Sequence, residues 1–210
     1  MTSRHTHRIG DATELRSIVG APNPGSVNKE MPRLDELCHR FLSLSPILFM
    51  STVGADGKAD VSPRGDLPGF IKILDDQTIA IPDRPGNRRI DTMSNILDNP
   101  GGSVGLIFLV PGIDELVRAS GRATISSDPA LLDEMAVNGK RPKLAIVITL
   151  DEVFFHCGKA LKRAGLWNPS RQVDRQVFPS YAQVIHARRP HEPLEKIEQF
   201  IADNYANELY

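Results

Sequence analysis

The chain has 210 residues, the size of one domain or two small ones, and a chain of this length buries enough surface to fold without disulfides. Hydrophobic residues make up 40% and charged residues 24%, which is typical of soluble globular proteins and excludes collagen-like, disordered and disulfide-scaffold classes. With 25 basic and 26 acidic residues the formal net charge is -1, so no overall positive field holds a nucleic acid, and any anion site must be local.

The first part of the chain predicts two helices with a loop between them. Asp11 and Glu14 have the spacing of a capping box, which indicates a helix over 11–19. Residues 20–31 are rich in proline and glycine and predict an extended loop. Apolar residues then recur at helical spacing, which predicts a second helix over 33–45.

From residue 46 the pattern changes to short strands. The β-prone run 47–53 ends in Gly54-Ala55-Asp56-Gly57, a signal for a hairpin turn. Three further strand candidates follow, over 58–63, 70–74 and 78–81. Together these four segments predict an antiparallel meander.

A helix then interrupts the strands. Asn87 is its expected N-cap, and Asn99-Pro100-Gly101-Gly102 ends it. The rest of the chain predicts strands over 103–110 and 115–125, a short helix from Asp128 to about residue 137, a long strand over 143–155 and a helical tail over 192–209.

No repeat, low-complexity tract or linker divides the sequence, so we expect one mainly β domain over 1–210 with added helices. Its barrel core is expected over about 46–157, between a helical N-terminal segment (1–45) and a helical C-terminal extension (158–210). Helices are missing between most successive strands, which favours a closed or partly closed antiparallel barrel over a doubly wound parallel sheet.

The densest group of charges lies between the fourth strand and the helix that follows it. Arg84, Arg88 and Arg89 fall within six residues there. A helix N-terminus offers unpaired N–H groups, and guanidinium groups beside it make a site for phosphate or carboxylate. The alternative is a solvated basic turn whose arginines pair with Asp83 and Asp91.

Two other segments are candidate binding elements. Five basic residues and one acid lie between Lys159 and Arg175, around Trp167, the single tryptophan. The alternative there is a surface helix followed by a tryptophan that packs on the barrel end. The strand end Ser62-Pro63-Arg64-Gly65-Asp66 combines a rigid residue, a charge and a flexible residue, as a backbone close to a ligand requires.

Other functions lack support in the sequence. Walker, G-x-G-x-x-G and H-E-x-x-H motifs are absent, which removes the usual nucleotidase, Rossmann and zincin signals. The cysteines form no zinc or redox spacing, and the first ten residues hold no apolar signal region. The apolar runs are too short to span a bilayer, so a reduced cytoplasmic protein is expected. Structural roles without a metal are expected for His5 with His7, Cys38 with His39, and His156 with Cys157.

The order of these motifs resembles the flavin mononucleotide (FMN)-binding split β-barrel proteins related to pyridoxamine 5'-phosphate oxidase. The resemblance covers about 33–167. Its carriers are the strand over 48–53, Asp56-Gly57, Ser62-Pro63-Arg64-Gly65, Asn87-Arg88-Arg89, Asn99-Pro100, the strand over 103–109 and the late Lys-Arg-Ala-Gly-Leu-Trp segment.

The resemblance implies a dimeric split β-barrel with FMN in the cleft between two subunits. It implies that Arg88 and Arg89, with Asn87 and Arg84, bind the flavin phosphate. Arg64 and Gly65 would lie along the ring system, whose polar edge would meet the backbone of Ile81, Pro82 and Asp83. Lys162, Arg163 and Trp167 would reach the flavin held mainly by the other subunit.

The resemblance also implies an oxidoreductase that moves a hydride through the flavin N5 to or from a small substrate, with Arg64, Lys162 or Arg163 as electrostatic helpers. The segment Val153-Phe154-Phe155-His156-Cys157 departs from the substrate-gripping motif of true pyridoxamine 5'-phosphate oxidases, so oxidation of the vitamin is not expected. Three alternatives stay open: a protein that binds or stores flavin or a haem-like ligand without catalysis, an enzyme using the deazaflavin F420, and a dimeric scaffold whose basic clusters form intersubunit ion pairs.

Overall fold

The computed structural model describes residues 7–210, and the chain forms two units, Met1–Glu30 and Met31–Tyr210. The first unit contains α1 (Ala12–Val19) and a 3-10 turn (Pro24–Ser26). The Asp11 carboxylate caps α1 by accepting hydrogen bonds from the N–H groups of Thr13 and Glu14. The predicted first helix and the irregular segment after it are therefore confirmed.

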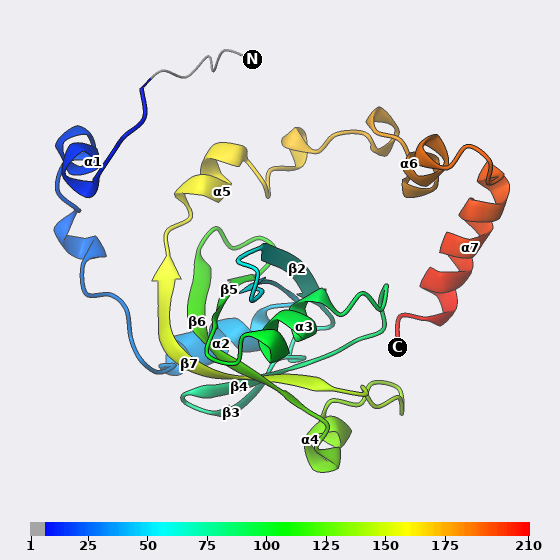
Figure 1. Cartoon of the computed structure of the whole chain (residues 1–210), viewed down its shortest axis with the longest axis horizontal. Helices are drawn as coiled ribbons and strands as arrows, with labels where there is room; N and C mark the ends of the chain where they lie inside the picture. The colour runs from blue at the N-terminus through cyan, green and yellow to red at the C-terminus, as the bar shows by residue number, and fades with distance from the viewer. Residues whose placement is uncertain (1–6) are drawn as a thin grey trace. The chain divides into compact units, whose positions relative to one another are not determined.

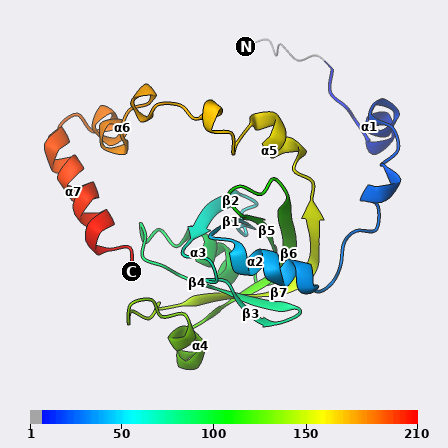
Figure 2. The same cartoon turned by 180° about the vertical axis from the view of Figure 1, so that it is seen from behind.

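The second unit is built on one seven-stranded antiparallel sheet, which Figures 1 and 2 show strongly curved. The strand order is β2-β1-β5-β6-β7-β4-β3. The strands are β1 (Ile47–Val53), β2 (Ala59–Gly65), β3 (Lys72–Asp75), β4 (Thr78–Pro82), β5 (Ser103–Leu109), β6 (Leu116–Ser126) and β7 (Ala145–His156). This is the partly closed, split form of the barrel expected from the sequence.

The predicted four-strand meander is wrong, because the two hairpins lie at opposite ends of the strand order. β1 pairs with β2 and β3 pairs with β4, but β2 and β3 are the two edges of the sheet. The connection between them places Phe70 and Ile71 in the core instead of making a tight turn. β3 therefore begins at Lys72, two residues after the predicted start.

Helices flank the sheet or follow it along the chain. These are α2 (Glu36–Leu44), α3 (Asp91–Asp98), α4 (Pro129–Glu134), α5 (Lys159–Ala164), α6 (Tyr181–Arg188) and α7 (Leu194–Asn207). α2 and α3 add Leu42, Met93 and Ile96 to the main core beneath the curved sheet. On the other face of β4 and β7, Leu132 and Met135 form a second cluster with Ala80 and Ala145. β4 is thus buried on both faces, and this packing holds its last residues, which lead into the loop before α3, in place.

The expected N-cap of the third helix is wrong. Asn87 instead accepts a hydrogen bond from the Arg89 N–H, and α3 begins at Asp91. Arg88 and Ile90 adopt left-handed backbone angles, with φ of 59° and 57°, which keep the chain out of the helix for three further residues. Ile90 occupies the cap position without a side-chain hydrogen bond, so the first N–H groups of α3 receive no side-chain cap.

The two cysteines differ sharply in accessibility, and both are free thiols. Cys38 is fully buried on α2, and burial, with Asp35 beside it, raises its pKa to about 12. Cys157 is exposed. We expect a thiol reagent at neutral pH to label Cys157 rapidly and Cys38 only after unfolding, because the thiolate is the reactive form. A Cys157→Ser variant should then remain unlabelled until denatured; two thiols reacting together in the native protein would contradict this.

Candidate functional site

A cleft of about 940 Å³ lies between the loop that follows β4 and the loop that precedes β7. Pro82 pairs with Ala145, so in this antiparallel pair the exit of β4 and the entry to β7 lie at the same end of the sheet. The volume is within the range of small-molecule and cofactor sites.

The lining of the cleft is strongly basic. It contains seven basic side chains, namely Arg64, Arg84, Arg88, Arg89, Lys140, Arg141 and Lys143, and three acidic ones, namely Asp60, Asp83 and Asp91. A chain with a formal net charge of -1 therefore concentrates positive charge at one place. Such a lining attracts an anionic ligand.

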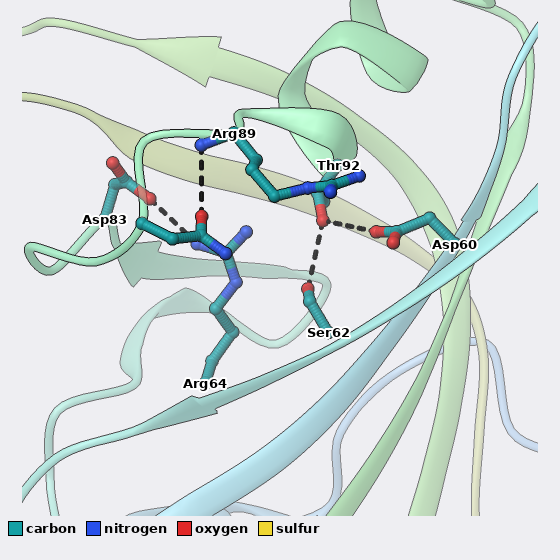
Figure 3. A network of polar contacts seen from close by, with 7 residues as sticks. Asp60, Ser62, Arg64, Asp83, Arg89 and Thr92 are labelled. Atoms are coloured by element: carbon teal, nitrogen blue, oxygen red, sulfur yellow. Dashed lines mark hydrogen bonds and ion pairs between the residues drawn. The ribbon is translucent and has the colours of Figure 1, made fainter. Parts of the chain in front are cut away.

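β2 supplies the floor of the cleft. Asp60, Ser62 and Arg64 alternate along this strand and therefore project from one face of it. Figure 3 shows them on the side of β2 that faces Thr92 of α3 and Arg89 of the loop before α3. The buried Thr92 hydroxyl donates to Asp60 at 2.9 Å and lies 3.0 Å from the Ser62 hydroxyl. Because Thr92 gives its proton to Asp60, Ser62 is the donor to Thr92, and this network holds the start of α3 on β2.

Only some of the hydrogen-bond donors of Arg64 have a partner. Its Nη1 donates to Asp83 at 2.8 Å, which ties β2 to the loop after β4. Its Nε is the one buried side-chain nitrogen or oxygen in residues 7–210 that lacks a hydrogen-bond partner. A buried donor without an acceptor costs about 1–3 kcal/mol, so a ligand with an acceptor at this point would be favoured.

Arg84 and Asp66 form the most buried ion pair at this site. The Arg84 Nε donates to Asp66 at 2.6 Å, and the Asp66 side chain is 1% exposed. Burial alone would raise the pKa of Asp66, but hydrogen bonds from Tyr210, the Leu67 N–H and Arg84 outweigh it and hold the pKa below its usual value. With Nε committed to Asp66, Arg84 can meet a ligand only through its two Nη atoms.

Arg88 and Arg89 are more available. Arg89 pairs with Asp91 at 2.7 Å, as the solvated-turn alternative expected, but its side chain is 71% exposed. Arg88 makes no ion pair among the residues that the structure describes. The arginines of this loop therefore differ: Arg84 is buried and paired, Arg89 is paired at the surface, and Arg88 is free.

Most residues expected to bind a cofactor meet in this cleft. Gly65, Pro82, Asp83 and Asn87 line it together with the four arginines at 64, 84, 88 and 89. Ile81, whose backbone was expected to meet the ligand, does not line the cleft, and its side chain lies in the core with no exposed surface. The Asp83 N–H is also engaged, because it donates to the Leu144 carbonyl at 2.9 Å.

The second predicted cluster lies elsewhere in the chain. Lys162 is 3.6 Å from Asp114, and the Trp167 Nε1 donates to the Ile113 carbonyl at 2.9 Å. Lys162, Arg163 and Trp167 thus follow the His156 end of β7, whereas the cleft lies at its Ala145 end. One subunit does not bring the two basic clusters together.

Several lining residues were missed by the sequence analysis. Lys140, Arg141 and Lys143 fall within four positions, a local signal that was readable, but their place opposite Arg84 follows only from the β4–β7 register. Tyr210 had no local signal at all. Its hydroxyl reaches Asp66 across 144 positions of sequence.

Two classes of feature are not found in the part of the chain that the structure covers. Among residues 7–210, no group of three or more His, Cys, Asp or Glu side chains is arranged to hold a metal ion. His5, one of the suggested pair with His7, lies outside the described residues. No helix in the described range is long and apolar enough to cross a membrane.

Comparison with known proteins gives one family match. The family described as "Pyridoxamine 5'-phosphate oxidase" matches residues 34–157, which include β2, the loop after β4 and β7. No curated protein matches the chain.

Solved structures give matches of low identity. HupZ from Group A Streptococcus is 20% identical, with a TM-score of 0.44, covering 56% of this chain and 91% of that one. A putative pyridoxamine 5'-phosphate oxidase from Lactobacillus delbrueckii is 21% identical, with a TM-score of 0.46 and coverage of 61% and 97%. HutZ from Vibrio cholerae, described as a heme storage protein, is 13% identical, with a TM-score of 0.40 and coverage of 60% and 94%.

Proposed function

Because the chain belongs to the pyridoxamine 5'-phosphate oxidase family, we propose that it is a flavoprotein that binds FMN in the cleft and acts as an oxidoreductase on a small substrate. The observation that carries this proposal is the combination of a free Arg88 with an unsatisfied, buried Arg64 Nε in one basic cleft. FMN is an anion joined to a flat ring rich in hydrogen-bond acceptors, and both unsatisfied groups suit it.

Each part of the cleft has a distinct role in this proposal. Arg88 and Arg89 hold the phosphate, with the uncapped N-terminus of α3 beside them. Arg64, fixed by Asp83, donates its Nε–H to an acceptor on the ring system. Lys140 and Lys143 supply positive charge from the opposite loop. FMN held by these residues would supply hydride and electron transfer, and the protein side chains would bind and orient it.

The exposed face of the sheet supports a homodimer. Phe49 on β1 stands directly between Pro63 on β2 and Ile107 on β5, and Phe49 and Ile107 are 39% and 40% exposed. Val53 and Val61 extend this apolar face. Contiguous apolar surface of this kind marks a protein interface, and a second copy is the partner proposed here. Lys162, Arg163 and Trp167, remote from the cleft of their own subunit, are available to complete the cleft of the other.

FMN titration tests this function. Purified protein is expected to absorb in the blue, to quench FMN fluorescence saturably, and to bind riboflavin at least about a hundredfold more weakly, because riboflavin lacks the phosphate that the arginines hold. Bleaching of the bound flavin by a reduced nicotinamide cofactor without oxygen would support an oxidoreductase, whereas a bound flavin that takes no electrons would indicate a binding protein. A colourless protein that neither quenches FMN nor melts at a higher temperature with it would overturn the proposal.

A further inference from the structure

Tyr210 contributes a side chain to the cleft from the end of the tail. After β7 the chain runs through α5, α6 and α7, and its end lies near the loop leading into α3 and the loop following α4, as both Figure 1 and Figure 2 show. The Tyr210 hydroxyl donates to Asp66 at 2.6 Å, and the ring lies 5.5 Å from the Arg84 guanidinium. Tyr210 is thus seated on the most buried ion pair of the site.

The contacts of Tyr210 connect both sides of the cleft. Asp66 and Arg84 belong to the side formed by β2 and the loop after β4, whereas Lys140 on the opposite loop donates from Nζ to the Tyr210 backbone oxygen at 3.1 Å. The hydrogen bond to the Asp66 carboxylate, followed by burial, raises the pKa of Tyr210, so the donating hydroxyl stays protonated at neutral pH. The ring is therefore held in place from three separate segments.

Tyr210 is also the accessible aromatic group of the cleft. Two aromatic side chains line the cleft, Phe70 and Tyr210. Phe70 is 7% exposed and belongs to the main core, so little of its surface is left for a ligand. Tyr210 is half-buried and is one of the residues that line the cleft of about 940 Å³.

We infer that Tyr210 is a ligand-binding residue whose ring packs against the aromatic part of the bound ligand and slows its release. This inference rests on the proposed function, because FMN is the ligand that supplies both the anion and the ring. Asp66 and Arg84 act here as positioning residues for Tyr210. In this inference the Asp66–Arg84 pair holds the end of the tail, and Arg88 and Arg89 bind the phosphate.

Release of FMN from the full chain, followed by its fluorescence, tests the inference with three variants. Tyr210→Ala removes the ring, Tyr210→Phe keeps the ring and removes the donor to Asp66, and Tyr205→Ala removes an exposed tyrosine of the same tail. Aromatic contacts contribute enough to change release about tenfold. We expect Tyr210→Ala to release FMN about tenfold faster than wild type, Tyr210→Phe to stay within about twofold of it, and Tyr205→Ala to be unchanged.

The outcomes separate this inference from the function on which it rests. If wild-type protein binds no FMN, the proposed function fails and the inference fails with it. If wild type binds FMN but Tyr210→Ala releases it at the rate of Tyr205→Ala, only the inference is overturned. If Tyr210→Phe releases FMN as fast as Tyr210→Ala, a ring without the hydrogen bond to Asp66 does not slow release, and the inference of ring packing is overturned as well.

Discussion

Replacing Arg88 and Arg89 together with alanine is expected to weaken FMN binding by at least about a hundredfold. Each guanidinium forms charge-assisted hydrogen bonds, which contribute about 1.5–3 kcal/mol apiece, and each 1.4 kcal/mol is roughly a factor of ten in the dissociation constant. Arg88 has no ion-pair partner within residues 7–210, so its loss removes ligand contacts without breaking a bridge. Fluorescence titration of the double variant measures the effect.

Arg122→Ala is the matched control for this experiment. Arg122 pairs with Asp151 at 2.9 Å and is 62% exposed, much as Arg89 pairs with Asp91 at 2.7 Å and is 71% exposed. Arg122 lies outside the cleft, so its loss should leave FMN affinity unchanged. Equal affinities for the double variant, the control and wild type would show that the phosphate is held elsewhere, with Lys140 and Lys143 the next residues to test.

Replacing Gly121 with alanine is expected to lower the free energy of unfolding by about 3 kcal/mol or more. Gly121 lies in β6 where the register with β7 shifts between Ser120 and Gly121. A Cβ at Gly121 would clash with the Thr149 carbonyl oxygen and would lie 3.0 Å from the Leu150 Cα, and both are backbone atoms of β7. Neither can move without breaking the longest strand pair of the sheet.

Thermal unfolding measures this loss, and Gly101→Ala is the control. For a chain of this size the expected fall in melting temperature is roughly 6–12 °C. A Cβ at Gly101 meets no atom within 4 Å, and the backbone there is not left-handed, so that variant should melt near wild type. Indistinguishable melting temperatures for the two variants would contradict the close approach of β6 to β7.

Local signals in the sequence located most elements of the fold. β1 was predicted with its observed ends, 47–53, because a proline precedes it and a glycine turn follows it. The family expected from the motif order is likewise confirmed over residues 34–157. Strand pairing was harder to predict from the sequence, because β4 lies beside β7 through contacts between segments that are distant in sequence. α6 was missed although Ser180 and Gln183 form a capping box that the sequence displays.

The site was predictable where its residues are neighbours in sequence. Arg84, Arg88 and Arg89 were found because they cluster, and Arg64 because a strand end carries it. The ion-pair partners that occupy two of these arginines were not found. Asp66 pairs with Arg84 and Asp83 pairs with Arg64, and both pairs join segments that are distant in sequence. The predicted tail helix forms as α7, but its large apolar side chains Phe200 and Tyr205 are 69% and 61% exposed, which its sequence alone did not indicate.

The pairing of β4 with β7 also determines when during folding a binding-competent cleft can exist. Thr78 pairs with Thr149 and Pro82 with Ala145, so a long segment of chain must close before this ladder forms. The β3–β4 hairpin joins the sheet through β7 alone. During synthesis the arginines of the loop after β4 are made before β7. The other side of the cleft, the loop that precedes β7, is held opposite them only when β7 has paired with β4. A ligand held between the two loops would therefore bind only after β7 has paired, and it would stabilise the folded sheet relative to the unfolded chain.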